Sequence, residues 1–376
     1  MNELILIISI VIYSPFVFAT LTNIIFFKSL RSEEFNINED LFIDSVSVLI
    51  PARNEEKNIG KCLNSPGLND KCIYEILVYD DDSTDNTKKI VEKIMEKNGK
   101  LKLIKGSTKP QGWVGKTNAC FELSKKASSP YFLFLDADTE LNKNVIKILI
   151  HKSKSNNITL ISAWPKLLLK SFPEKILMPM LNFLVFSTYP GILSSKVKSS
   201  SMGIAHGAMI LCNADIYKKI GGHKIVKESL FEDTTLAKLW RANNEKTLLI
   251  NGKNIVSTRM YNNTNEIWNG FSKNFYPAFN NDLKFFLFIT FFLFSFVLFP
   301  ILIILLSSFK IISIFLIFIV VAPLILRLII DIKFSSTLFS AIFYPIPIIF
   351  MFLLGLNSRN KFLKSGVEWK GRKYKK

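Results

Sequence analysis

Hydrophobic and polar positions divide the chain into stretches with different patterns. Residues 4–27 are almost continuously apolar, and about 20 such residues suffice for a membrane-spanning helix. Between residues 45 and 142, short apolar runs alternate with amphipathic stretches. Long apolar runs then return at residues 283–306, 311–330 and 338–356. The pattern predicts an N-terminal membrane helix, a domain of strands and helices, and a C-terminal membrane block.

The alternating stretch predicts repeated strand–helix units. Strands are expected at 46–50, 75–79, 101–104 and 131–135, with helices at 54–64, 84–97 and 116–126 between them. Such units build a parallel sheet with helices on both faces. The expected fold is therefore α/β and Rossmann-like, and its ligands should bind outside the carboxyl ends of the strands.

Two further segments have less certain patterns. Lys28 and Arg31 follow the first apolar run, which favours an uncleaved anchor over a signal peptide and places the next residues in the cytosol. The apolar run Ile176–Leu193 contains Pro179 and Pro190 and has a marginal length for a span. We expect it to be a buried or interfacial segment.

Composition supports contact with a membrane. Lys and Arg number 48 against 30 Asp and Glu, a formal charge of +18, and the mean hydropathy is +0.27. Positive charge gathers at the ends of the apolar runs, which favours anionic lipid over nucleic acid as the partner. Four cysteines without CxxC spacing (Cys62, Cys72, Cys120 and Cys212) indicate reduced thiols and no disulfide framework.

Acidic clusters follow two of the expected strands. Asp80-Asp81-Asp82-Ser83-Thr84-Asp85 comes after the second strand, and helix capping accounts for one or two of these residues but not for three consecutive carboxylates. Asp136-Ala137-Asp138 comes after the fourth strand, where two carboxylates can hold a hard divalent ion together with substrate phosphates. A solvated turn is the alternative for this second cluster, which alone is a weak signal. Both clusters in order are a stronger signal.

These motifs resemble a known family. Val48–Glu56, Val78–Asp85 and Asp136–Asp138 together resemble the donor-binding half of family 2 glycosyltransferases, which have the GT-A fold. The resemblance covers about residues 45–280. It extends to Gly112-Trp-Val-Gly-Lys116, Gly221-Gly222-His223, Glu232-Asp233 and Arg259-Met-Tyr261. With the ending Val367–Tyr374, these motifs are similar to the branch of diaponeurosporenoate and hopanoid-associated glycosyltransferases. Asp82 departs from the family, which usually has Gly there.

The resemblance implies a role for each site residue. The donor-binding residues would be Pro51, Ala52, Arg53, Glu55, Asp80, Asp81, Lys116 and Asp136. Asp138, with Asp136, would hold Mg²⁺ or Mn²⁺ against the diphosphate and so assist the leaving group. Asp233 is the expected general base, and Glu232, Gly207 and His206 are the expected acceptor-binding residues.

Simpler roles compete with some of these assignments. Lys116 could equally be a solvated lysine that opens a helix, and Asp233 could be a helix cap. For His206 and His223, bonding to the backbone is favoured over catalysis. The Gln-x-x-Arg-Trp motif of processive synthases is absent, because the single glutamine is Gln111 and the corresponding region holds Trp268 and Lys273.

The expected organisation follows from these patterns. It comprises an anchor (1–28), a linker (29–44), a GT-A domain (45–280, with donor half 45–142 and acceptor half 143–280), membrane helices (281–357) and a basic cytoplasmic tail (358–376). A cytosolic tail requires two C-terminal spans, so 338–356, which contains Pro345 and Pro347, is expected to be re-entrant or interfacial.

The expected activity is inverting transfer of a hexose. The donor would be UDP-glucose and the acceptor an isoprenoid such as a carotenoid or hopanoid. The protein would be multi-pass in the cytoplasmic membrane, with its catalytic domain in the cytosol. Alternatives are a polyprenyl-phosphate or diacylglycerol glycosyltransferase and a non-catalytic scaffold that binds nucleotide-sugar. A base at Asp233 favours a hydroxyl acceptor, because a carboxylic acid is already ionised at neutral pH.

Overall fold

The computed structural model describes residues 2–30, 44–279, 281–307, 314–364 and 366–374. Most of the expected linker, and residues 308–313 near the junction of the first two C-terminal apolar runs, lie outside the described residues. The chain forms two compact units. The sheet unit comprises Lys28–Leu168 and Leu193–Met260, and the helical unit comprises Met1–Phe27, Leu169–Ile192 and Tyr261–Lys376.

The sheet unit contains the strands β1 (Val46–Ala52), β2 (Ile73–Asp80), β3 (Leu101–Lys105), β4 (Tyr131–Leu135), β5 (Thr139–Leu141), β6 (Leu160–Leu167), β7 (Met209–Asn213) and β8 (Thr247–Thr258). Its helices are α2 (Ile59–Leu63), η2 (Pro66–Asn69), α3 (Thr87–Met95), α4 (Gly115–Lys126), α5 (Val145–Asn156), η3 (Ser200–Met202), α9 (Ala214–Ile220), α10 (Gly222–Ile225) and α11 (Glu232–Ala242). Helix α8 (Gly191–Lys196) crosses the boundary between the units.

The helical unit contains α1 (Asn2–Phe26), α6 (Phe172–Leu177), α7 (Pro179–Thr188), α12 (Thr264–Asn274), α13 (Asp282–Leu293), the π-helical segment η4 (Phe294–Leu298), α14 (Phe299–Ser307), α15 (Ile314–Lys333), α16 (Leu338–Ile342) and α17 (Pro345–Lys364). Strands β9 (Val367–Trp369) and β10 (Arg372–Tyr374) form a hairpin after α17.

The eight strands of the sheet unit form one sheet in the order β3-β2-β1-β4-β7-β6-β8-β5. Strands β1 to β4 are parallel, as predicted. Strand β7 runs antiparallel to both β4 and β6, β8 is parallel to β6, and β5 is antiparallel to β8. The predicted α/β, GT-A-like fold is confirmed, and the antiparallel pairings begin after β4, where regular strand–helix alternation ends.

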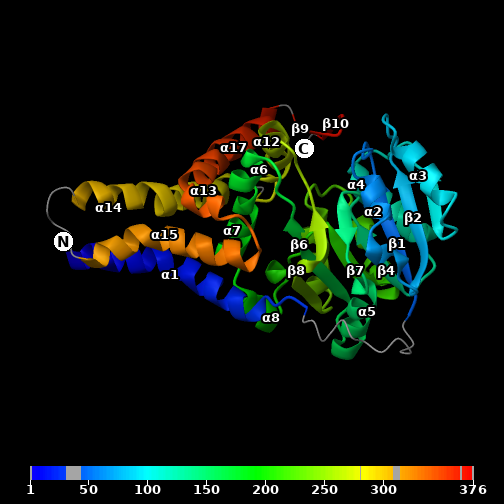
Figure 1. The fold of residues 1–376 in the computed structure, drawn as a ribbon, viewed down its shortest axis with the longest axis horizontal. Coiled ribbons are helices and arrows are strands. Elements are labelled where there is room, and N and C mark those ends of the chain that lie inside the picture. Colours follow the sequence, from blue (N-terminus) through cyan, green and yellow to red (C-terminus); the bar gives the residue numbers. More distant parts are fainter. Residues whose placement is uncertain (1, 31–43, 280, 308–313, 365, 375–376) are drawn as a thin grey trace. The chain divides into compact units, whose positions relative to one another are not determined.

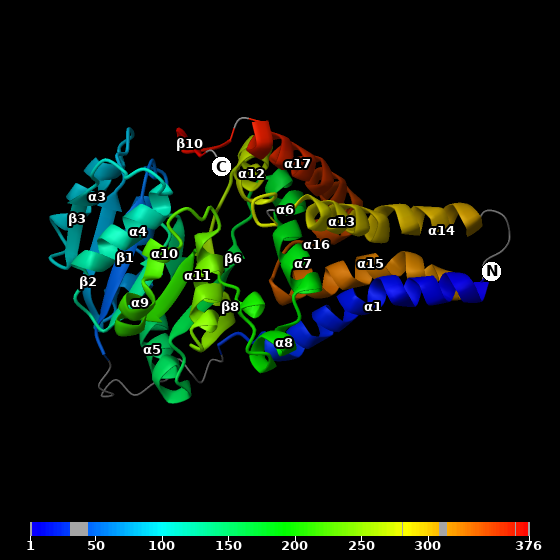
Figure 2. The ribbon, with the colours of Figure 1, turned by 180° about the vertical axis from the view of Figure 1, so that it is seen from behind.

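Alternating side chains of the strands enter two separate cores. On β1, Val48 and Ile50 pack with α2, α3 and α5, whereas Leu49 packs with α4, α9 and α11. On β4, Leu133 faces the first core and Phe132 the second, and all five side chains are fully buried. The period of two places helices on both faces of the sheet, with α2 and α3 on one face (Figure 1) and α4, α9 and α11 on the other (Figure 2).

The first helix of the sheet unit is shorter than predicted. It begins at Ile59, not at Asn54, because Asn54 has a left-handed backbone (φ 52°). The Asn54 amide donates to Ser83 Oγ (3.0 Å), and its Oδ1 accepts from the Thr84 amide (2.8 Å). These bonds hold the residues after β1 as a loop against the loop after β2. Helix α3 likewise starts at Thr87 and not at Thr84.

The proline-containing segment 176–193 is largely buried as far as Ser187, one of the two expected outcomes, whereas Thr188 and Leu193 are exposed. It forms the end of α6, all of α7 and the start of α8, with Pro179 in the first turn of α7. Phe183 and Phe186 are fully buried, and Asn23 of α1 donates to the carbonyl of Phe186 (2.8 Å). The segment therefore packs inside the helical unit, although the expected domain boundaries would place it with the sheet.

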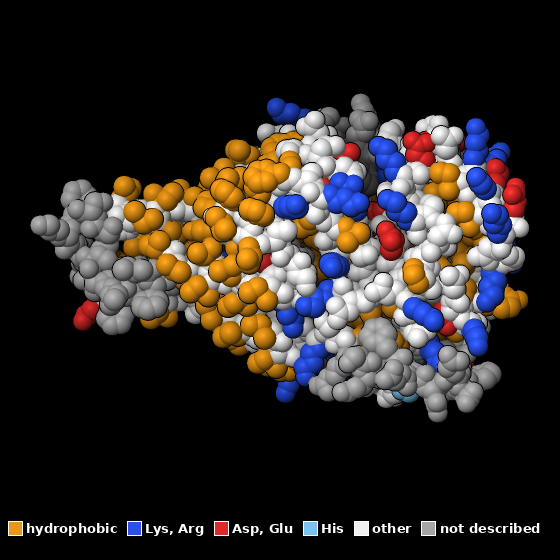
Figure 3. Space-filling model, viewed as in Figure 1, with side chains coloured by type: hydrophobic (Ala, Val, Ile, Leu, Met, Phe, Trp, Pro, Cys, Tyr) orange, Lys and Arg blue, Asp and Glu red, His pale blue; other side chains and the backbone are white. Residues whose placement is uncertain are grey.

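Two stretches of the helical unit, Glu3–Phe26 and Asp282–Leu305, are long and apolar enough to cross a membrane. They contact each other through Tyr13, whose hydroxyl donates to the Ser295 carbonyl in η4 (2.7 Å). Hydrophobic side chains cover much of the outer surface of this unit (Figure 3). These features indicate association with a membrane.

A buried ion pair lies inside the helical unit. Arg327 and Asp331 are one turn apart on α15 and are 1% and 0% exposed, with Nε and Oδ2 3.0 Å apart. Ser340 of α16 also donates to Asp331, and the guanidinium of Arg327 lies over the ring of Phe183 in α7 (5.1 Å). The pair thus connects three helices in an apolar interior, where charges are stable only when paired.

Helix α17 is continuous from Pro345 to Lys364. The apolar run 338–356 is divided at its prolines, because α16 ends at Ile342 and α17 begins at Pro345. Both prolines lie in the first turn of α17, where a missing N–H removes no hydrogen bond of the helix. The helix changes from apolar to polar after Leu356.

Candidate active site

The predicted donor residues lie at the carboxyl ends of β1, β2 and β4. Pro51 and Ala52 end β1, Asp80 ends β2, and Asp136 follows β4. Because these strands are parallel neighbours, their ends meet at one edge of the sheet. Arg53 connects two of these loops, because its guanidinium donates to the carbonyls of Asp81 and Asp82.

The backbone at Asp82 explains the departure from the family pattern. Asp82 has a left-handed conformation (φ 61°), which glycine adopts without strain and which aspartate adopts more readily than most residues. Ser83, Thr84 and Asp85 mainly support the loops: Asp85 accepts from the amides of Glu56 (3.0 Å) and Thr87 (2.9 Å). Asp80 and Asp81, at the beginning of this motif, are buried, and Asp80 Oδ1 accepts from the Ser83 amide (3.3 Å).

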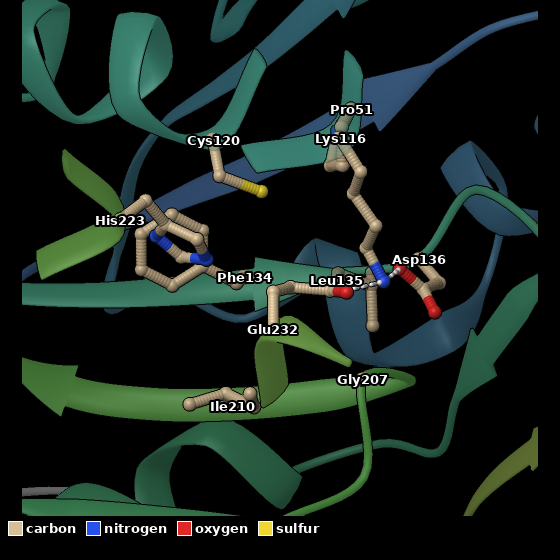
Figure 4. Close-up of a pocket in the computed structure, with 10 residues that line it drawn as sticks. All are labelled: Pro51, Lys116, Cys120, Phe134, Leu135, Asp136, Gly207, Ile210, His223 and Glu232. Carbon is tan, nitrogen blue, oxygen red and sulfur yellow. Dashed lines mark ion pairs between the residues drawn. The ribbon is translucent and has the colours of Figure 1, made fainter. Parts of the chain in front are cut away.

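The Lys116 ammonium lies between two carboxylates. It is 2.6 Å from Asp136 Oδ1 and 2.8 Å from Glu232 Oε1, and Figure 4 shows its side chain reaching from α4 to both. Burial alone would lower the pKa of Lys116, but Asp136 and Glu232 outweigh it and raise that pKa well above its usual value. A solvated lysine at a helix start is therefore not what the structure shows.

The lysine is held in place by its own helix start. The Val114 amide donates to the carbonyl of Lys227 (2.8 Å), and the Thr117 hydroxyl donates to the same carbonyl (2.7 Å). Lys227 lies in the loop before α11. The segment Gly112–Lys116 is thus tied to the loop that leads to Glu232, which keeps the two ends of the ion pair together.

Asp233 lies next to this cluster. Its Oδ2 accepts from the Gly207 amide (2.8 Å) and its Oδ1 from the Thr234 amide (2.6 Å). Burial, followed by the charge of Glu232, raises the pKa of Asp233 to about 7. A carboxylate with that pKa is suited to take a proton at neutral pH. Asp233 is the second residue of α11, not its cap, which is Phe231.

Gly207 forms the floor of the cluster. A Cβ on this residue would lie 2.8 Å from Lys116 Nζ, 3.3 Å from Asp136 Oδ2 and 3.4 Å from Asp233 Oδ2. Gly207 also lines the same pocket as Pro51 (Figure 4). Glycine is required there because any side chain would occupy the space between the charged groups.

Asp138 and Asp136 supply a donor set that fits a divalent ion. They flank Ala137 in a turn closed by the Thr139 amide, which donates to the Asp136 carbonyl (3.1 Å). Mg²⁺ beside substrate phosphates ordinarily takes one or two protein carboxylates. Within the described part of the chain, no group of three or more His, Cys, Asp or Glu side chains could hold a metal, so waters and phosphate oxygens would supply the remaining ligands.

The two site histidines have different surroundings. His206 Nδ1 accepts from the Ala208 amide (3.1 Å), and its ring meets Trp164 edge-on (4.8 Å). That local bond is the expected structural arrangement, and acceptor binding by His206 stays a prediction. His223 lines the pocket with Cys120, Phe134 and Glu232, a placement that sequence reasoning missed. The two glycines before His223 were the sequence feature that could have indicated this placement.

Comparisons with known proteins give a consistent result. Residues 47–221 match the model of glycosyl transferase family 2. The chain is 31% identical over 221 residues to a 4,4'-diaponeurosporenoate glycosyltransferase of Staphylococcus haemolyticus, covering 58% of this chain and 57% of that protein. It is 27% identical over 247 residues to the protein of that name from Staphylococcus aureus, covering 62% and 60%. The chain thus spans less than two thirds of these relatives.

Among solved structures, the chain is similar to a mannosyltransferase from Pyrobaculum calidifontis, determined with GDP-Man and Mn²⁺. The TM-score is 0.49 and the identity 14%, over 97% of this chain and 99% of that one.

Gly207→Ala should disable the site without unfolding it. The new methyl group would displace the Lys116 ammonium, and misplacement of about 1 Å in a reacting site costs on the order of 100-fold in rate. The melting temperature should change little, because the displaced atom ends a flexible side chain. Sugar transfer, the activity in the names of the relatives, supplies the assay.

Gly99→Ala is the matched control, because a Cβ there would meet nothing within 4 Å. Native transfer by Gly207→Ala would contradict this description of the site.

Proposed function

We propose that the chain, whose residues 47–221 match the model of glycosyl transferase family 2, transfers a hexose from a nucleotide-sugar to a lipophilic, carotenoid-like acceptor. The observation that carries the proposal is the Lys116 cluster. It joins Asp136, at the end of a donor-side strand, to Glu232, which directly precedes the candidate base Asp233. A cation for phosphate and a base for the acceptor thus occupy one site.

For the donor, we propose a UDP-hexose, with UDP-glucose as the first candidate. The nucleoside would lie along the loops after β1 and β2, where Ala52, Arg53, Glu55 and Asp81 meet. Lys116 would turn from its carboxylate partners toward the diphosphate, for which a compact ammonium is well suited.

For the metal, we propose Mg²⁺ or Mn²⁺ held by Asp138 and Asp136. The bound ion would supply Lewis-acid neutralisation of charge on the departing nucleoside diphosphate. The chain's own contribution is to orient the two carboxylates through the turn after β4.

For the acceptor, we propose a hydroxyl group. The names of the relatives specify a carboxylate, which has no proton to give up at neutral pH. Here Asp233 is held by two backbone amides, and its pKa of about 7 lets it accept a proton from an alcohol. The relevant difference from those relatives would therefore be the chemical class of the acceptor's reacting group.

For the membrane, we propose a cytosolic sheet unit and a cytosolic tail. Lys333 Nζ donates to the Ile24 carbonyl (3.1 Å), so the C-terminal ends of α1 and α15 meet, and Lys28 follows the same end of α1. Arg359 pairs with Asp282 (2.6 Å), which places the polar end of α17 beside the start of α13. Both contacts fit two C-terminal spans with all basic ends in the cytosol, and α17 not spanning the membrane.

Asp233→Asn should reduce kcat by about 100-fold or more, because a positioned base contributes about 10²–10⁴-fold. In the native protein, transfer should rise as the pH increases through about 7, since the base acts only after losing its proton. The variant should lose that pH dependence and keep its affinity for UDP-sugar. Asp215→Asn, an exposed carboxylate on α9, is the control. A near-normal rate for Asp233→Asn would refute both the base and the alcohol acceptor.

Chelation should abolish transfer, and added Mn²⁺ or Mg²⁺ should restore it. Asp138→Asn should remain folded by melting temperature while losing transfer at ordinary metal concentrations, because one of two protein ligands is weakened. Undiminished turnover in excess EDTA would show that no divalent ion is needed.

A cysteine added after Lys376 should be protected from an impermeant thiol reagent in intact cells. Asn2→Cys, at the first residue of α1, should be labelled in the same cells and so controls for access. Labelling of the C-terminal cysteine in intact cells would place the tail outside and require three C-terminal spans.

A further inference from the structure

The Asp136 carboxylate lies where two cations would meet. Lys116 Nζ is 2.6 Å from its Oδ1, and the proposed divalent ion would bind the same side chain. A carboxylate has lone pairs enough for two partners, but an ammonium and a divalent ion on one carboxylate are close neighbours and repel each other. The contact with Lys116 therefore opposes the binding of a metal ion at Asp136.

A second contact keeps the ammonium in this position. Glu232 Oε1 lies 2.8 Å from Lys116 Nζ, on the side away from Asp136 (Figure 4). The backbone of Gly207 comes so near that a Cβ there would lie 2.8 Å from Nζ. Two carboxylates and one glycine thus form a fitted place for a single cation, and Lys116 fills it.

The two contacts of the ammonium differ in exposure. The side chains of Lys116 and Asp136 are 32% and 30% exposed, whereas the side chain of Glu232 is 11% exposed. A ligand that arrives from solvent therefore reaches the contact with Asp136 first. A partly exposed ion pair contributes little net stability, so a group with more negative charge than one carboxylate can replace Asp136 as the partner of Lys116. A nucleoside diphosphate is such a group, and an ammonium is a common partner of phosphate.

We infer that Lys116 occupies the metal-binding carboxylate Asp136 until a nucleoside diphosphate draws the ammonium away, so that the divalent ion binds tightly only together with the nucleotide. Lys116 thus couples metal binding to nucleotide binding, and by linkage the coupling is reciprocal. The inference rests on the proposed function, because it takes Asp136 as a metal ligand and a nucleoside diphosphate as the leaving group.

Metal binding without turnover tests this coupling. Free Mn²⁺ is measured by electron paramagnetic resonance as the full chain, in nanodiscs of zwitterionic lipid, is titrated with and without UDP. Lys116→Met keeps the length of the side chain and removes its charge. Without UDP, this variant should bind Mn²⁺ about tenfold or more tightly than the native protein, a size usual for coupled sites. UDP should then improve Mn²⁺ binding less in the variant than in the native protein.

Two further variants locate the gain at Asp136. Lys102→Met removes another ion-paired lysine, whose Nζ lies 3.2 Å from Glu75 Oε2, and should leave Mn²⁺ binding unchanged. Adding Asp136→Asn to Lys116→Met should remove the gain. A gain that survives Asp136→Asn would mean that the charge of Lys116 acts on another site, which would contradict the inference.

The outcomes separate this inference from the proposed function. Suppose that both proteins bind Mn²⁺ with UDP, beyond the Mn²⁺ that UDP holds by itself, and have the same melting temperature. Equal Mn²⁺ affinities without UDP would then overturn the inference and leave the metal assignment standing. If neither protein bound Mn²⁺ even with UDP, the metal site of the proposed function would be wrong, and this inference with it.

Discussion

One ammonium group organises the candidate site. Lys116 at the start of α4 holds together Asp136, which follows β4, and Glu232, which begins α11. With Asp233 beside them, the cluster has three carboxylates and one cation. Burial, together with the excess negative charge, raises the pKa values of Asp233 and Asp136. Such a cluster is poised to change when the phosphates of a ligand attract the lysine. Gly207 matters because it leaves room for that rearrangement.

Sequence reasoning predicted the parts of this site that depend on residues close to one another along the chain. The parallel strands β1 to β4 have a simple apolar pattern, and acidic residues after β2 and β4 must lie at one edge of such a sheet. The pairing of Lys116 with Glu232 could not be predicted, because it depends on how α11 packs on the sheet. The antiparallel pairing of β7 with β4 could not be predicted either, because no pattern in the neighbouring residues specifies it. Asn54 misled the helix prediction, because its left-handed backbone is set by bonds to Ser83 and Thr84.

The helical unit follows a different physical rule. Its outer surface is largely apolar, while two pairs of polar groups meet inside it: Arg327 with Asp331, and the Tyr13 hydroxyl with the Ser295 carbonyl. An environment without water requires such pairing. The prolines predicted a break in the apolar run 338–356, and the run is divided there between α16 and α17, which begins at Pro345. A chain that combines this unit with a nucleotide-sugar fold is suited to an acceptor that is itself dissolved in lipid.

The central claim is that the Lys116 cluster transfers sugar to a lipophilic molecule. The most direct measurement uses the full chain in lipid nanodiscs with radiolabelled UDP-glucose, other labelled UDP-hexoses and a lipid extract, and counts the label that enters the organic phase. The account predicts label in that phase for the native protein and its loss in Lys116→Met at an unchanged melting temperature. Bound but untransferred nucleotide-sugar would identify a scaffold, and undiminished transfer by Lys116→Met would contradict the role assigned to the lysine.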